Sequence, residues 1–257
     1  MNQSSKPFRD RLRSGAVLIG TFVKTPSPIV CEVLASTSLD AVCLDAEHAP
    51  FGRRDLDSCI HALRAAGMPC LVRLQNDSHE HVLNVLDCGA TGLVIPHVTS
   101  AEQAKAIAKS AHYGRGGRGY AGSSRAAGYT GKPMAEHLRD SAAQTTVIAQ
   151  IEDIEAVEAV EEIAAVEGID CLFVGRIDLT VAYGVDSPND PRVLEAVEKV
   201  CRAGRKSGTA VGMYVSDVSE AGKWIEQGAS LFLLESDHAF LLRGAAGLAK
   251  RFRKLSE

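Results

Sequence analysis

The sequence predicts a single (β/α)8 barrel over residues 1–257, and three observations support this fold class. Eight short apolar runs alternate with helical patterns, four of these runs repeat one residue pattern, and polar residues follow several of them. Strict alternation of strand and helix favours a parallel sheet. Eight such units favour a closed barrel, a fold that commonly reaches about 250 residues as one domain.

The repeated pattern consists of a small residue and an apolar residue, then a short variable part and a run of apolar residues. It occurs as SLDAVCLD from Ser38, GATGLVIP from Gly89, GIDCLFVG from Gly168 and GASLFLLE from Gly228. The other apolar runs begin at Ala16, Met68, Thr145 and Thr209. Continuous runs of Val, Leu, Ile and Phe are typical of parallel strands that are buried on both faces. The repeated segments are therefore expected to be the even-numbered strands.

Two helices between these strands have readable ends. Ser100 is placed to cap one of them, with Glu102 in its first turn. Pro191 opens the other, and Gly208 ends it. An open, doubly wound sheet is the alternative architecture, but no G-x-G-x-x-G motif follows the first strand.

The region 113–144 is the one long irregular connection, and its length predicts an active-site loop. Its glycines alternate with Arg115, Arg118 and Arg125. Glycine–arginine segments of this kind bind RNA in some proteins. However, the formal charge of -4 gives the chain no general attraction to nucleic acid or to an anionic membrane. We therefore expect a lid whose arginines contact a second, anionic substrate.

The composition predicts a cytoplasmic protein without a membrane segment. Hydrophobic residues make up 46% and charged residues 23% of the chain, as in ordinary soluble proteins. No run approaches the roughly 18 apolar residues that span a bilayer, and the N-terminal segment lacks the apolar core of a signal peptide. The seven cysteines are odd in number and never spaced C-x-x-C. They are therefore expected to be inert thiols.

Two carboxylates after neighbouring strands predict a metal site. Glu152 follows the fifth strand and Asp178 follows the sixth, so both leave the barrel at the end that carries active sites. Mg2+ or Mn2+ typically takes one or two carboxylates from the protein. The alternative is that Glu152 favours a helix N-terminus and Asp178 caps a turn.

A candidate base and a candidate anion-binding residue follow the second and third strands. His48 lies three residues after Asp45, so the carboxylate is expected to orient the imidazole and raise its basicity. The alternative is an ordinary surface histidine. Arg73 ends the third strand, where it is expected to bind a substrate carboxylate. The alternative for Arg73 is a structural ion pair with a nearby acid.

The lysine positions argue against a Schiff-base mechanism. Such a mechanism needs a lysine on a strand that faces the substrate, and only Lys24 lies near a strand end. Arg176 cannot replace it, because a guanidinium does not deprotonate to a usable amine. The substrate carbonyl is therefore expected to be polarised by a metal ion.

Several segments, in this order, resemble the HpcH/HpaI aldolase family. They are LDAEHAPF, VRLQND, LDCGATGLVIPHVTSAEQA, QIED, FVGRIDL and ESDHAFLL. The resemblance extends over nearly the whole chain, and its motif order is far more specific than any single motif. It implies a metal-dependent lyase that reversibly cleaves a 4-hydroxy-2-oxo acid to pyruvate, or a similar 2-oxo acid, and an aldehyde. The family includes 4-hydroxy-2-oxoheptanedioate and 2-dehydro-3-deoxyglucarate aldolases.

The resemblance also implies roles for individual residues. It implies that Glu152 and Asp178 hold Mg2+, Mn2+ or Co2+, that His48 and Asp45 form a proton-transfer dyad, and that Arg73 holds pyruvate. The further substrate contacts that it implies come from Gln150, Gly175, Ile177 and Asp178. Family members are typically hexamers that exchange C-terminal helices, a role for which the segment from Ala239 to Leu255 is the candidate.

The chain departs from the family pattern at three places. Arg176 and Ile177 interrupt a segment that often reads G-P-A-D-L, and Glu235 stands where glycine is frequent. The region 113–144 differs from that of the heptanedioate enzymes. These departures concern the part of the site expected to bind the aldehyde, so the resemblance implies no particular aldehyde.

Two other functions remain open. A citrate-lyase-like or acyl-CoA lyase barrel would use similar metal chemistry, but no segment identifies a surface for the CoA nucleotide. A non-catalytic barrel that binds 2-oxo acids is the second alternative. Such a protein would have little need of a base such as His48.

Overall fold

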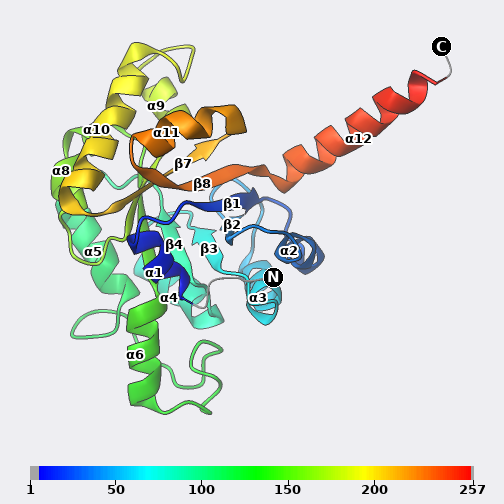
Figure 1. Cartoon of the computed structure of the whole chain (residues 1–257). Helices are drawn as coiled ribbons and strands as arrows, with labels where there is room; N and C mark the ends of the chain where they lie inside the picture. The colour runs from blue at the N-terminus through cyan, green and yellow to red at the C-terminus, as the bar shows by residue number, and fades with distance from the viewer. Residues whose placement is uncertain (1–5, 256–257) are drawn as a thin grey trace.

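The computed structural model describes residues 6–255 and confirms the (β/α)8 barrel. Eight parallel strands pair in chain order, and the last strand closes the barrel against the first (Figure 1). They are β1 (Leu18–Val23), β2 (Ala41–Asp45), β3 (Cys70–Arg73), β4 (Gly92–Ile95), β5 (Thr146–Ile151), β6 (Cys171–Val174), β7 (Ala210–Val215) and β8 (Ala229–Ser236). Each predicted apolar run contains one of these strands, and the open-sheet alternative is wrong.

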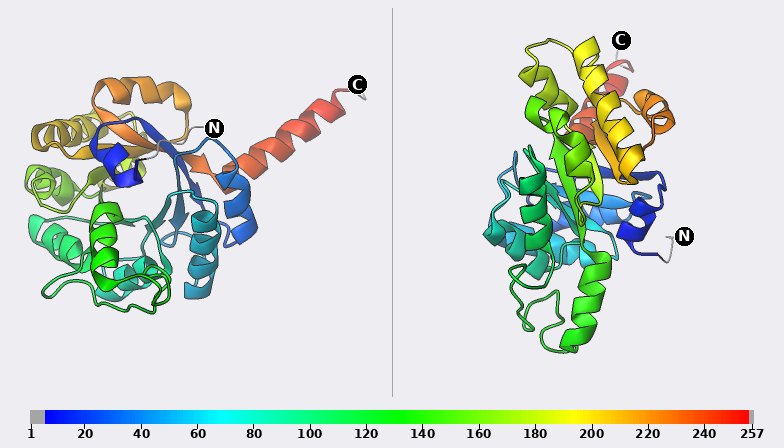
Figure 2. Two further views of the ribbon diagram at one scale, coloured as in Figure 1. Left: turned by 60° about the horizontal axis from the view of Figure 1, so that its bottom comes forward. Right: turned by 90° about the vertical axis from the view of Figure 1, so that its left-hand side faces the viewer.

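Helices surround the barrel, except that α6 extends beyond one end and α12 projects to one side (Figures 1 and 2). They are α1 (Phe8–Arg13), α2 (Pro28–Ala35), α3 (Arg53–Ala65), α4 (His79–Cys88), α5 (Ala101–Ala111), α6 (Met134–Gln144), α7 (Ile154–Glu158), α8 (Val160–Ala164), α9 (Arg176–Ala182), α10 (Pro191–Ser207), the 3-10 turn η1 (Val218–Glu220), α11 (Ala221–Glu226) and α12 (Asp237–Arg253). None of the helices in this described part of the chain has both the length and the apolar character needed to cross a bilayer.

Both predicted helix boundaries are confirmed. The Ser100 side chain accepts a hydrogen bond from the backbone N–H of Gln103 at the start of α5. Helix α10 begins at Pro191 and ends at Gly208, whose φ of 77° lies in the left-handed region that favours glycine.

The core has an inner and an outer layer. Inside the barrel, alternate strand residues such as Leu71, Ile148 and Phe173 pack together with Phe8 and Leu12 of α1. Helix α1 therefore closes the end of the barrel where the strands begin. The outer layer lies between the strands and the surrounding helices. Six of the seven cysteines are buried, all seven are free thiols, and they contribute to these layers as small apolar residues.

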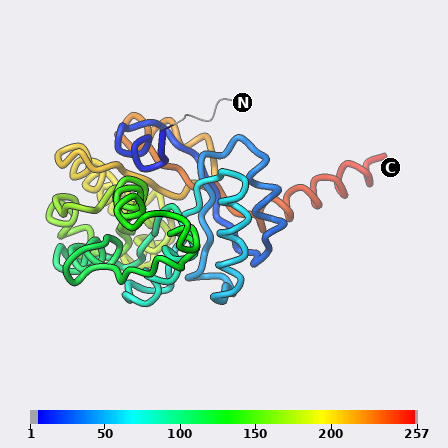
Figure 3. The backbone as a smooth tube through the Cα atoms, turned by 90° about the horizontal axis from the view of Figure 1, so that it is seen from below, coloured from blue at the N-terminus to red at the C-terminus, as the bar shows by residue number. Residues whose placement is uncertain are grey.

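The connection between α5 and α6 lies at the end of the barrel where the strands begin (Figure 3). It follows a helix and leads through α6 into the start of β5, so chain connectivity keeps it away from the carboxyl ends of the strands. Arg118 is 5% exposed and pairs with Asp87, and Arg125 pairs with Asp57. The predicted lid over the active site of the same chain is therefore wrong. Two of its three arginines instead fasten the connection to α3 and α4.

Candidate active site

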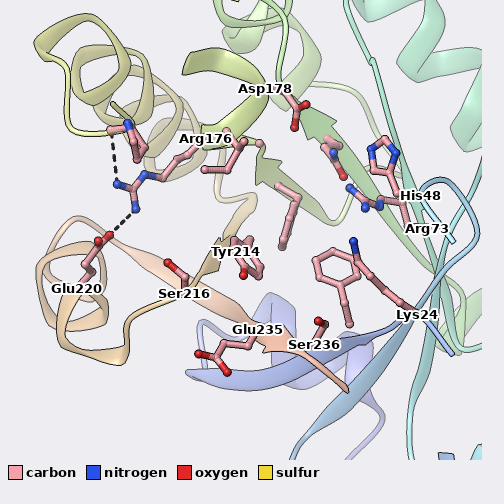
Figure 4. A pocket seen from close by; sticks show the side chains of 16 residues that line it. Lys24, His48, Arg73, Arg176, Asp178, Tyr214, Ser216, Glu220, Glu235 and Ser236 are labelled. Atoms are coloured by element: carbon pink, nitrogen blue, oxygen red, sulfur yellow. Dashed lines mark hydrogen bonds and ion pairs between the residues drawn. The ribbon is translucent and has the colours of Figure 1, made fainter. Parts of the chain in front are cut away.

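A cavity of about 310 Å³ opens at the carboxyl ends of the strands (Figure 4). Six of the eight predicted site residues line it, namely His48, Arg73, Gln150, Gly175, Ile177 and Asp178. Asp45 and Glu152 are buried and hydrogen-bonded to Arg73 and Gln150 respectively. The structure thus brings all eight predicted residues to one place.

Asp45 anchors two cationic side chains beside the cavity. Its carboxylate accepts hydrogen bonds from Nε of Arg73 at 3.0 Å and from Nη2 at 2.8 Å. The Nζ atom of Lys24, which also lines the cavity, lies 3.3 Å from the same carboxylate. Burial raises the pKa of Asp45, but the hydrogen bonds and charge of Arg73 outweigh it and hold the pKa below its usual value. Arg73 therefore forms the ion pair with a nearby acid that was considered as the alternative to substrate binding. The Nη1 atom of Arg73 takes no part in this pair with Asp45.

The expected contact between Asp45 and the His48 ring is not present. Asp45 instead accepts a hydrogen bond from the backbone N–H of His48, at 3.2 Å, and its two oxygens are also paired with Arg73 and Lys24. The His48 side chain is 57% exposed, and its Nε2 lies 3.7 Å from a carboxylate oxygen of Glu47. Asp45 therefore positions the loop that carries His48 rather than the imidazole itself.

Glu152 is a buried carboxylate held by two donors. It is 2% exposed and accepts the backbone N–H of His97 at 2.9 Å and the side-chain amide of Gln150. Burial raises the pKa of Glu152, the two hydrogen bonds partly oppose this, and the charge of Asp178 raises it further. The carboxylate charge at this position is thus poorly compensated by the protein alone.

Glu152 and Asp178 converge beside Gly175. A Cβ atom on Gly175 would lie 2.8 Å from Oε2 of Glu152 and 3.5 Å from Oδ2 of Asp178. Both carboxylate oxygens therefore face one small space that only glycine leaves open. The predicted proximity of these two residues is what strand adjacency in the barrel produces, since β5 pairs with β6.

Two residues that the sequence interpretation did not include lie next to Glu152. Ligand atoms of Glu47, His97 and Glu152 lie within 4.8 Å of one another. Burial lowers the pKa of His97, but its hydrogen bond to Asp153 and the charges of Glu152, Asp153 and Glu47 outweigh this and raise it. The positions of these two residues in the sequence could have indicated them as site residues. Glu47 follows β2 and His97 follows β4, both at the active-site end of the barrel.

The side chains around Glu152 are suited to binding a divalent cation. Carboxylates predominate, as hard cations require, and an imidazole is acceptable to Mn2+ and Co2+. The Oε1 atom of Gln150 is buried without a hydrogen-bond partner and belongs to a side chain that lines the cavity. The space beside Gly175 leaves room between Glu152 and Asp178.

The opposite wall of the cavity carries a second charged group, which the sequence interpretation did not assign. Arg176, at the start of α9, donates to Glu220 at 2.5 Å and lies over the ring of Trp224, 5.0 Å from its centre. Glu235 and Tyr214 line the same wall.

The end of β8 and the end of β1 are joined next to the cavity. Asp237, the first residue of α12, accepts the backbone N–H groups of Lys24 at 2.8 Å and of Thr25 at 3.0 Å. These bonds fix the backbone from which Lys24 extends.

Comparison with known proteins agrees with this geometry. Residues 18–242 match the model of the family described as HpcH/HpaI aldolase/citrate lyase. A hydroxypyruvate/pyruvate aldolase of Pseudomonas aeruginosa is 33% identical over 96% of this chain and 92% of its own. A 4-hydroxy-2-oxo-heptane-1,7-dioate aldolase of Escherichia coli is 29% identical over 95% and 94%. The crystal structure of a family protein from Burkholderia cenocepacia has a TM-score of 0.90 at 33% identity, covering 95% of this chain and 98% of that one.

Proposed function

Because this chain belongs to the HpcH/HpaI aldolase/citrate lyase family of carbon–carbon lyases, we propose that it is a divalent-metal-dependent pyruvate aldolase. It reversibly cleaves a 4-hydroxy-2-oxo acid to pyruvate, or a similar 2-oxo acid, and an aldehyde. Relatives named for aldolase activity cover nearly the whole chain and support the reaction class. The observation that carries the proposal is the convergence of Glu152 and Asp178 on the space beside Gly175.

Glu152 and Asp178 hold Mg2+, Mn2+ or Co2+ in this proposal, and Glu47 and His97 lie close to Glu152. A bound divalent cation supplies a Lewis acid that polarises the 2-oxo carbonyl and stabilises the negative charge developing on its oxygen. Gln150 orients Glu152 through its amide N–H and turns its remaining oxygen to the same region.

Arg73 binds the pyruvate carboxylate, using the part of its guanidinium that Asp45 does not engage. In the cleavage direction, a base removes the proton of the C4 hydroxyl and the C3–C4 bond breaks, releasing the aldehyde. The bonding electron pair passes into the enolate of pyruvate, and His48 returns a proton to C3. Gly175 and Ile177 line the cavity and limit the position of the 2-oxo acid.

A homo-oligomer is part of the proposal. Helix α12 projects from the barrel and exposes Leu241, Leu242, Leu248 and Phe252 (Figures 1 and 2). A helix with this much apolar surface is typical of an interface. We assign it to exchange between subunits of a hexamer.

The test is pyruvate release from a panel of 4-hydroxy-2-oxo acids after chelation, with Mg2+, Mn2+ or Co2+ added back. We expect activity only with added metal, and expect Glu152→Ala and Asp178→Ala to lose it while remaining folded. Full activity of either variant after chelation and without added metal would show that the assignment is wrong.

A further inference from the structure

The side of the cavity that lies away from His48 and Arg73 carries its own set of polar and charged side chains. Figure 4 shows Arg176, Ser216 and Glu220 on the side opposite His48 and Arg73. If the 2-oxo acid occupies the end near Arg73, its reaction partner must approach from this other side. The charges and donors of this wall therefore decide the chemical class of that partner.

Arg176, the arginine at the start of α9 on this wall, has both of its terminal nitrogens directed to protein acceptors. Arg176 is 7% exposed, and its Nη1 donates to Glu220 at 2.5 Å. Its Nη2 faces the carbonyl oxygen of Pro188 at 3.4 Å and the side-chain oxygen of Asn189 at 3.3 Å. Figure 4 shows the guanidinium directed toward Glu220 and away from Asp178. A ligand in the cavity thus meets a guanidinium whose terminal donors are directed to protein acceptors.

Glu235 adds a carboxylate to the same wall at a conformational cost. Its φ of 51° lies in the left-handed region, which is unfavourable for a residue with a side chain. Strained backbone of this kind persists where the surroundings hold it, and it concentrates at functional sites. Glu235 lines the cavity, and its carboxylate pairs with Arg243 of α12, which is not among the residues that line the cavity.

We propose that this wall binds a neutral, hydroxylated aldehyde and rejects an aldehyde that carries a carboxylate at its far end. The inference rests on the proposed aldolase function. Hydroxyl groups of the aldehyde donate to Glu220 and Glu235 and exchange hydrogen bonds with Ser216 and Tyr214. A distal carboxylate would face Glu220 and Glu235 and would have to displace one of them from its arginine.

The experiment compares two matched pairs of aldehydes at fixed pyruvate and metal. The pairs are glyceraldehyde with tartronate semialdehyde, and butanal with succinic semialdehyde. Within each pair, we expect kcat/KM to favour the neutral member by about tenfold or more, the effect of one charge-assisted hydrogen bond. Equal or higher kcat/KM for the anionic members would overturn the inference.

Substitution of Glu220 tests the cause of the preference. Glu220→Gln releases Arg176, so kcat/KM for succinic semialdehyde should rise relative to butanal by about tenfold. Glu226→Gln removes the same charge from an exposed position of α11 outside the cavity and should keep the wild-type ratio. Glu235→Gln supplies a second variant should Glu220→Gln fail to fold, and it should shift the ratio in the same direction. Wild-type ratios in both cavity variants would refute the proposed role of the wall.

Exchange of the pyruvate methyl protons with solvent deuterium separates the two possible failures. Exchange without preference for the neutral aldehydes would contradict only this inference. Absence of exchange, together with absence of product from every aldehyde, would contradict the proposed function and the inference with it.

Discussion

At the scale of single residues, one buried carboxylate organises much of the cavity. Asp45 holds Arg73 through two hydrogen bonds, pairs with Lys24 and accepts the backbone N–H of His48. Arg73 lies at the end of β3, Lys24 directly follows β1, and His48 lies in the loop after β2. Its removal should therefore disturb several parts of the site together.

Asp45→Asn should lower the free energy of unfolding by about 3 kcal/mol, since Arg73 then loses its fully buried charged partner and keeps only its ion pair with Glu47 at 3.2 Å. The pKa of Asp45 lies below its ordinary value of 3.8. The ionised pair therefore contributes stability above about pH 4, and this contribution is lost as the pH falls through the folded-state pKa. Urea unfolding of wild type and Asp45→Asn at a series of acidic pH values measures this. The difference between their free energies of unfolding should become smaller as the pH falls.

The control for this measurement is Asp57→Asn, which breaks an ion pair with Arg125 at a more exposed position. We expect it to cost at most about 1 kcal/mol, as surface pairs do. A difference between wild type and Asp45→Asn that stays constant down to the lowest pH would contradict the assigned role of the Asp45 pair.

Gly175→Ala should reduce metal-dependent turnover by about 100-fold, the usual effect of displacing a reacting group by about 1 Å. The added Cβ would lie 2.6 Å from Cβ of Glu152 and 2.8 Å from its Oε2, so the carboxylate has to move. Steady-state kinetics across a metal titration measures this. Gly119→Ala, where nothing lies within 4 Å of the added atom, should remain fully active. Normal turnover in Gly175→Ala would mean that the space beside it is not used.

The sequence allowed these residues to be located but not paired. Glu152 and Asp178 were predictable neighbours because adjacent parallel strands end together. Asp45 and His48 are close in the chain, yet Asp45 pairs with Arg73, since β2 and β3 align Asp45 directly with Arg73. Glu47 and His97 were missed because the sequence does not show that the residues after β2 and β4 come close to Glu152. Only the three-dimensional arrangement of the strands shows this.

At the scale of elements, connectivity decides which end of the barrel a connection occupies. The segment between α5 and α6 is long and rich in arginine, which predicted a lid. It follows a helix, however, and a connection that follows a helix leads to the start of a strand. Arg118 stacks its guanidinium 4.7 Å from the ring centre of Tyr113, which makes it a structural residue of this end.

Arg118→Ala should lower the free energy of unfolding by about 2 kcal/mol, between the values for surface and buried ion pairs. The KM for the 2-oxo acid should stay at the wild-type value, because the residue lies at the other end of the barrel. Thermal unfolding and steady-state kinetics measure the two effects. Arg115→Ala, an exposed position in the same connection, should stay within about 0.5 kcal/mol of wild type. A raised KM in Arg118→Ala would instead link this end to the cavity.

Helix α12 is the element that we assign to the proposed interface between subunits. The double substitution Leu242→Glu and Leu248→Glu should shift the proposed hexamer to a smaller assembly, since both leucines are exposed in the single chain and would be buried in the proposed interface. Light scattering during size-exclusion chromatography measures the mass. Lys250→Glu changes a polar position of the same helix and serves as the control. A wild-type protein smaller than a hexamer, or an unchanged mass in the double variant, would contradict the assignment.

At the scale of the whole molecule, the two ends of the barrel differ in structure: one end is closed by packed side chains, and the other end is open. The end where the strands begin is closed by α1, with Arg9 bound to Asp170. The other end carries the cavity. This division was predictable because it follows from the alternation of strands and helices along the chain. The partners of each charged side chain were not, because they depend on distances between strands far apart in the sequence.

The contact between Asp237 and the end of β1 has a consequence for biosynthesis. Asp237 lies 213 residues after Lys24 and 212 residues after Thr25, the two residues whose backbone N–H groups it binds. In the same way, one edge of β1 is paired only by β8, the last strand of the barrel. A ribosome that has already produced β1 to β7 therefore still holds a chain whose first strand has an open edge. The two backbone hydrogen bonds at Lys24 and Thr25 cannot form before Asp237 has been synthesised, so the cavity stays incomplete until β8 and the start of α12 are present.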